Sequence, residues 1–142
     1  MLSKGICGLV IFSVAIMGMT SAFALTELER ATISDPRLEN AFGISFGDHI
    51  NAQTQLQISA DITNHQEKSQ DFVYLVQVKN EIGIVEKIGW VSGNLAPHQK
   101  LEASLSWTPE IPGTYTTEIF AWEGLVNHNA IAEYREFQIM VS

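Results

Sequence analysis

The segment from Trp107 to Trp122, WTPEIPGTYTTEIFAW, contains the features that decide the fold. Pro109 and Pro112 lack a backbone N–H donor and Gly113 permits a positive φ, so strand pairing must stop there and restart afterwards. The residues that follow, TYTTEIFAW, form the densest β-branched and aromatic run in the chain. The segment therefore predicts the end of one strand, a corner, and the central strand of a sheet.

The rest of the chain contains further strand patterns on both sides of this corner. Residues 55–63 and 101–107 alternate between apolar and polar side chains, which predicts strands that share a sheet with one wet face. Asn80–Gly83 reads as a hairpin turn, and shorter pairing segments are expected at 37–42 and 44–46. The second sheet should contain 72–79, 84–91, 114–122 and 132–141. About seven strands without a credible helix predict an all-β, Greek-key β-sandwich.

The first residues have the composition of a secretory signal peptide. Lys4 is the only charge before Glu27, an apolar run extends from residue 6 to residue 19, and Ala22 and Ala24 offer a cleavage site. We therefore predict a signal peptide over 1–24, a flexible N-terminal arm over 25–32 and the sandwich domain over 33–142. The expected location is secreted, extracellular or at the cell surface, without a stable membrane span after cleavage; retention as an uncleaved anchor is the alternative.

Charge and residue usage restrict the classes of function. Without Lys4, seven basic residues face sixteen acidic ones, so the mature net charge is 7 − 16 = −9, which disfavours nucleic acid and anionic membranes as partners. The single cysteine, Cys7, lies in the predicted signal peptide, so a blue-copper site and a disulfide are not expected. The four histidines are not spaced as metal ligands, and no serine has the setting of a nucleophile. We expect no metal, no cofactor and no catalytic residue, and hence no enzyme.

Three motifs together carry a resemblance to a known family. GTYTTEIFAW follows a Pro-Gly corner, LAPHQK precedes a strand ending in SWTP, and QLQISADITN lies near the start of the mature chain. The sequence thus resembles immunoglobulin-like or fibronectin type III-like domains, and more narrowly the small secreted Ig-like domains of archaeal extracellular proteins. The resemblance implies that Tyr115 is a tyrosine corner, whose hydroxyl ties the corner to the backbone. It implies no catalytic or binding residue, and the antibody-type cysteine pair and the tryptophan expected in strand 72–79 are both missing.

The candidate functional residues lie on the outside of the second predicted sheet. If Tyr115 points into the core, then Phe120 and Trp122 point outward, near Val73 and Leu75. Trp90 is a further candidate, although the sequence does not fix its face across the hairpin. We call these five residues the outer patch. Apolar patches of this kind mark contacts, so we predict a binding or structural module that contacts an unknown protein partner or itself.

Two alternatives remain open for the outer patch. Residues 25–42 or a loop could cover it, or a bulge could turn Trp122 inward. If it is exposed, its aromatic rings could instead stack on sugar rings, with Glu118 or Glu123 accepting hydroxyl hydrogen bonds. A carbohydrate-binding module with a glycan partner is therefore the alternative function.

Overall fold

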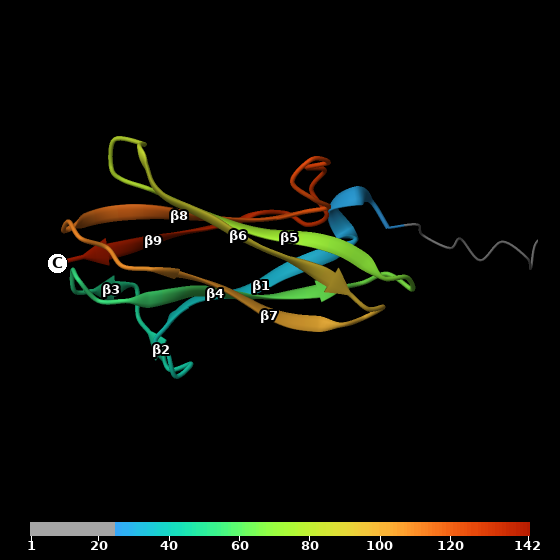
Figure 1. The fold of residues 1–142 in the computed structure, drawn as a ribbon, viewed down its shortest axis with the longest axis horizontal. Coiled ribbons are helices and arrows are strands. Elements are labelled where there is room, and N and C mark those ends of the chain that lie inside the picture. Colours follow the sequence, from blue (N-terminus) through green and yellow to red (C-terminus); the bar gives the residue numbers. More distant parts are fainter. Residues whose placement is uncertain (1–24) are drawn as a thin grey trace, which may run out of the picture.

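The structure, a computed structural model, describes residues 25–142, and the predicted signal peptide lies outside the described residues. Nine strands form two sheets that face each other as two layers (Figure 1). A short 3₁₀ helix, η1 (Glu27–Glu29), precedes them. The strands are β1 (Ala31–Glu39), β2 (Ser45–Phe46), β3 (His49–Ile50), β4 (Leu56–Asn64), β5 (Gln70–Lys79), β6 (Val85–Leu95), β7 (Lys100–Trp107), β8 (Gly113–Trp122) and β9 (Arg135–Val141).

The strand order places the alternating segments as the sequence predicts. One sheet has the order β2-β1-β4-β7, and the other has the order β3-β9-β8-β5-β6, in which only the β3–β9 pair is parallel. The predicted strands 55–63 and 101–107 are β4 and β7, neighbours in the first sheet, and the other four predicted strands are in the second. The β-sandwich prediction is confirmed. The structure has nine strands where about seven were predicted, and two of the nine, β2 and β3, are only two residues long.

The core lies between the sheets and is built by side chains of period two. Leu56, Ile58 and Ile62 of β4 are fully buried against Tyr74 and Val76 of β5. Burying one large aliphatic side chain contributes roughly 1.5–3 kcal/mol, so a continuous core of this kind supplies most of the stability. Within the described residues, the core cluster falls between residues 31 and 141, so the fragment 25–142 contains all of this cluster.

The proline-glycine corner has the predicted geometry. The Tyr115 hydroxyl donates a 2.6 Å hydrogen bond to the carbonyl oxygen of Ile111, so Tyr115 acts as a tyrosine corner. Its ring also meets the edge of Trp107, with the ring centroids 5.1 Å apart. The predicted hairpin turn forms too, because the Asn80 N–H donates to the Ile84 carbonyl and Gly83 adopts a φ of 84°.

The N-terminal boundary differs from the prediction. We expected a flexible arm over 25–32 and a first strand at 37–42, but β1 already begins at Ala31, which is fully buried and donates its N–H to Ile131. The Ser34-Asp35-Pro36 turn signal is instead a bulge within β1, where the register shifts and Asp35 has a φ of 50°. A bulge accommodates a proline inside a strand without ending it. Sequence reasoning therefore read an internal irregularity as the start of the sheet.

None of the helical structure in residues 25–142 is long and apolar enough to cross a membrane.

Candidate functional site

The cross-strand register brings all five residues of the outer patch together. Val73 lies opposite Trp122, and Leu75 lies between Phe120 on one side and Trp90 on the other. Because paired residues in an antiparallel sheet point to the same face, this register assigns Trp90 to the outer face. Trp122 also faces outward, and β8 has a regular register with β5 over this stretch, so no bulge turns it inward.

Burial within the outer patch is uneven. Val73 and Leu75 are only 3% and 5% exposed although they point away from the sandwich core. Phe120 and Trp122 are half-buried, and Trp90 is 51% exposed. The aliphatic centre is therefore already covered by the aromatic side chains around it, and those aromatic side chains form the accessible surface.

Three residues that sequence reasoning did not assign to the patch extend it. The Tyr134 ring stacks on Phe120 with centroids 5.5 Å apart and planes 21° from parallel. His128 meets Trp122 edge-on at 5.8 Å, and Ile88 is exposed on the same face of β6 as Trp90. Tyr134 has the same alternation phase as the outward residues of β9, and this pattern in the sequence could have assigned it to the outer face. Only the β8–β9 register could place it beside Phe120.

An apolar groove of about 590 Å³ lies at one end of this face. Phe120, Trp122 and Tyr134 line one part of it, and Ala130 and Ala132 leave room because their side chains are small. Leu28 of η1 also lines the groove. The N-terminal segment therefore forms part of the groove wall. This arrangement differs from the alternative in which that segment covers the outer patch.

The polar groups beside the patch are bonded to one another. Glu118 accepts hydrogen bonds from Lys79 Nζ at 2.7 Å and from Gln77 Nε2 at 3.2 Å. The hydrogen bond from Lys79 lowers the pKa of Glu118, and the same bond raises the pKa of Lys79. Both carboxylates that were expected to accept hydrogen bonds from a ligand are thus already paired, since Glu123 has partners of its own.

Glu123 holds the loop that builds the groove. Its carboxylate pairs with Arg30 and accepts a 2.7 Å hydrogen bond from Asn127 Nδ2. Arg30 follows η1, so this ion pair fixes the loop after β8 against the N-terminal helix, and Figure 1 shows the two segments side by side. The groove is therefore held in shape by a contact between segments far apart in sequence.

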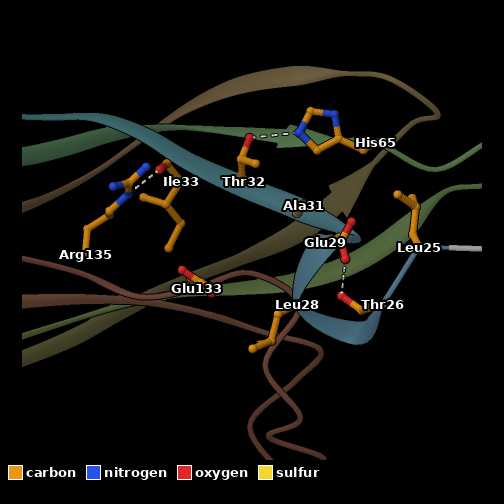
Figure 2. A pocket seen from close by; sticks show the side chains of 10 residues that line it. All are labelled: Leu25, Thr26, Leu28, Glu29, Ala31, Thr32, Ile33, His65, Glu133 and Arg135. Atoms are coloured by element: carbon orange, nitrogen blue, oxygen red, sulfur yellow. Dashed lines mark hydrogen bonds between the residues drawn. The ribbon is translucent and has the colours of Figure 1, made fainter.

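A second hollow of about 550 Å³ lies on the other side of η1, between β1 and the start of β9. Figure 2 shows the Thr32 hydroxyl hydrogen-bonded to His65 Nε2 at 2.9 Å, and Arg135 donating to the Ile33 carbonyl at 2.8 Å. These side chains therefore bind the backbone or each other. In the described part of the chain, no group of three or more His, Cys, Asp or Glu side chains is placed to hold a metal ion.

No protein-family model matches the sequence, and no curated protein matches it. Among solved structures, the chain is similar to the C-terminal domain of Wzt, with a TM-score of 0.67 and 14% identity over 80% of this chain and 74% of that domain. It is also similar to a CARDB domain from Pyrococcus furiosus in complex with di-metal ions, with a TM-score of 0.53 and 16% identity over 83% of this chain and 97% of that one.

A third similar structure is a cycloisomaltooligosaccharide glucanotransferase of Paenibacillus sp. complexed with cycloisomaltoheptaose. The TM-score is 0.61 and the identity 12%, over 79% of this chain but only 14% of the enzyme, so the likeness is to a small part of that protein. Identities this low establish the fold alone. The three structures support an Ig-like β-sandwich, and the narrower archaeal resemblance stays a prediction.

Proposed function

We propose that the protein is a non-enzymatic binding module, secreted or displayed at the cell surface, whose outer patch contacts another protein. The observation that carries this proposal is the aromatic surface of the outer face. Phe120, Trp122 and Tyr134 contact one another, and Trp90 lies exposed on the other side of the buried Leu75. Exposed apolar surface of this extent on a small domain usually marks a contact. Tryptophan and tyrosine are also the residues that most often dominate protein–protein binding energy.

The geometry favours a protein partner over a carbohydrate. Stacking on a sugar requires a free ring face and nearby unpaired hydrogen-bonding groups, but Phe120 packs against both Tyr134 and Trp122. Glu118 and Glu123 are paired within the molecule. An apolar groove beside exposed aromatic residues instead suits an aliphatic or aromatic side chain inserted by a protein.

A carbohydrate-binding module is the second candidate because Trp90 exposes about half of its surface. A glycan array separates the two. Saturable binding that is lost in Trp90→Ala would support the carbohydrate function and contradict the protein contact.

Site-specific photo-cross-linking tests the protein contact in cells that produce the full chain. Benzoylphenylalanine at Tyr134 places a reactive group on the outer face, and the same residue at Ser106 provides a control on the exposed side of β7. We expect discrete cross-linked protein species from the Tyr134 position only. Equal cross-linking from both positions, or none from either, would contradict the proposal.

A further inference from the structure

Strand β6 is a long sheet edge with an unusual concentration of exposed apolar residues. It ends the order β3-β9-β8-β5-β6, and its length of 11 residues contrasts with two residues each for the edge strands β2 and β3. The large hydrophobic residues exposed in β6 or just before it are Ile82, Ile84, Val85, Ile88, Trp90 and Val91. Natural proteins usually protect long edges with charges, prolines or covering segments, because open edges pair with other strands.

The free backbone groups of this edge can be identified from the alternation across the sheet. The Ala121 carbonyl accepts from the Ile131 N–H on the β9 side, so the even-numbered residues of β8 direct their backbone groups toward β5. These even-numbered residues of β8 lie opposite odd-numbered residues of β5, so the even-numbered residues of β5 direct their backbone groups toward β6. Their partners in β6 are the odd-numbered residues. The N–H and C=O groups of Ile88, Trp90 and Ser92 therefore point to the open edge.

We infer that β6 pairs antiparallel with β6 of a second copy of this chain, around a two-fold axis at Gly89. In this register Ile88 lies opposite Trp90 of the second copy, and by symmetry Trp90 lies opposite Ile88. Both residues have free backbone groups, and both side chains lie on the outer face, so each pair combines hydrogen bonds with apolar contact. At the axis, Gly89 lies opposite Gly89 of the second copy. A residue without Cβ lets the two backbones approach closely there.

Charge favours this register over its neighbours. The only charged residues of β6 are Glu86 and Lys87, so the strand has no net charge although the chain is acidic. With the axis at Gly89, the two Lys87 residues are offset by four positions, roughly 13 Å, which exceeds the Debye length of about 8 Å at physiological salt. An axis at Lys87 or Ile88 would bring these like charges opposite or diagonal to each other. An axis at Trp90 would pair Ile88 with the polar Ser92.

The other long edge, β7, is a poorer candidate for such pairing. Its exposed face carries Lys100 and Glu102, both of which form ion pairs with residues of their own sheet. Pairing through β6 would also join the outer patches of the two copies into one surface, because Trp90 is part of the outer patch and also lies on the edge strand β6. The inference thus rests on the proposed function and names its partner as a second copy of the chain.

Disulfide trapping tests the register directly in residues 25–142, which contain the core cluster described above and no cysteine. Ile88→Cys and Trp90→Cys variants are prepared separately, mixed and oxidised gently. In the mixed dimer the two cysteines are directly opposite, about 5.5 Å apart between Cα atoms, while the symmetry-related Trp90–Ile88 pair stays intact. Each variant alone holds its cysteines on a diagonal about 7–8 Å long, which is too far for an unstrained disulfide.

We expect the mixed disulfide to form well above the excess that random collision gives. Sedimentation equilibrium of the parent should show a dimer, strengthened by salt because each copy of 25–142 carries a net charge of 7 − 16 = −9. Ser92→Pro removes an edge donor without touching the β5 pairing and should raise the dimer dissociation constant at least about tenfold. Ser92→Ala, which keeps that N–H, should leave the dissociation constant unchanged.

Three results would overturn the inference: a parent that is monomeric at about 1 mM, a dimer in which the mixed disulfide does not exceed the statistical level, or a Ser92→Pro variant that is folded and still dimeric. If the parent is monomeric but photo-cross-links from Tyr134 reach a different protein, the self-pairing fails and the proposed protein contact stands. If the cross-links also fail, both proposals are wrong.

Discussion

Asn64 is a fully buried amide that ties two loops to the end of β4, so its replacement by aspartate should have a large, pH-dependent effect. Its Nδ2 donates to the carbonyl oxygens of Lys68 at 2.8 Å and Ala96 at 3.1 Å, and its Oδ1 accepts from the Gln66 N–H at 3.1 Å. Asn64→Asp keeps the shape and the acceptor but replaces the donating NH₂ group by an oxygen that faces two carbonyl oxygens. One change therefore separates hydrogen bonding from packing.

The magnitude follows from the bonds lost. Two hydrogen bonds are removed at about 1 kcal/mol each, and a buried carboxylate facing carbonyl oxygens adds a desolvation cost of a few kcal/mol. We expect Asn64→Asp to lower the free energy of unfolding by about 3–5 kcal/mol at neutral pH. Protonation restores one donor, so the loss should fall to about 1–2 kcal/mol in acid.

The stability of Asn64→Asp relative to the parent should decrease as the pH rises. The carbonyl neighbours and burial disfavour the charged form, so the pKa of the introduced carboxyl is raised in the folded state above its unfolded value near 3.9. The protonated carboxyl therefore contributes to the free energy of unfolding below its unfolded pKa. This contribution is lost as the pH rises through the folded pKa. The measurement is urea unfolding at intervals from about pH 3.5 to 7.5, with each variant compared with the parent at the same pH.

Asn51→Asp is the matched control, because Asn51 is exposed and the change adds the same charge. We expect its difference from the parent to stay within about 0.5 kcal/mol throughout. A loss of stability in Asn64→Asp no larger than that in the control would contradict this prediction, and so would a loss of the same size at both ends of the pH range.

Three further predictions concern the corner, the β5–β6 pair and the polar side of the outer face. Tyr115→Phe removes the corner hydrogen bond and should lower the free energy of unfolding by about 1 kcal/mol in urea; no loss would mean the hydroxyl has no structural role. Gly93→Ala places a Cβ 3.0 Å from a phenylalanine ring atom and should cost about 1–3 kcal/mol more than Gly47→Ala, whose Cβ meets nothing within 4 Å; equal thermal midpoints would contradict this. Glu118→Gln removes the ion pair with Lys79, and because that pair lowers the pKa of Glu118, its stabilisation is present at neutral pH and lost as pH falls through the folded pKa. A difference from the parent that does not shrink in acid would refute this assignment.

Local sequence patterns were sufficient to determine the sandwich, because strand alternation and turn chemistry act over a few residues. The alternation at 55–63 placed Leu56 and Ile58 in the core, and the proline-glycine corner with Tyr115 set the geometry of the central strand. The same period of two put Phe120 and Trp122 outside once Tyr115 was inside. Each of these predictions needs only that successive side chains point to opposite faces.

Only the tertiary structure could decide features that depend on register between distant strands. Trp90 joins the outer patch because β5 pairs with β6 in one register, and Tyr134 joins it because β9 pairs with β8; a shift of one residue would have reversed either face. The Asp35 bulge, which lets β1 continue past a proline, likewise depends on tertiary contacts, because β1 pairs with β4 on both sides of it and Arg37 joins Asp35 to Asp61 of β4. The two carboxylates expected to bind a ligand were already paired with Lys79 and Arg30, because electrostatic partners are chosen by proximity in space.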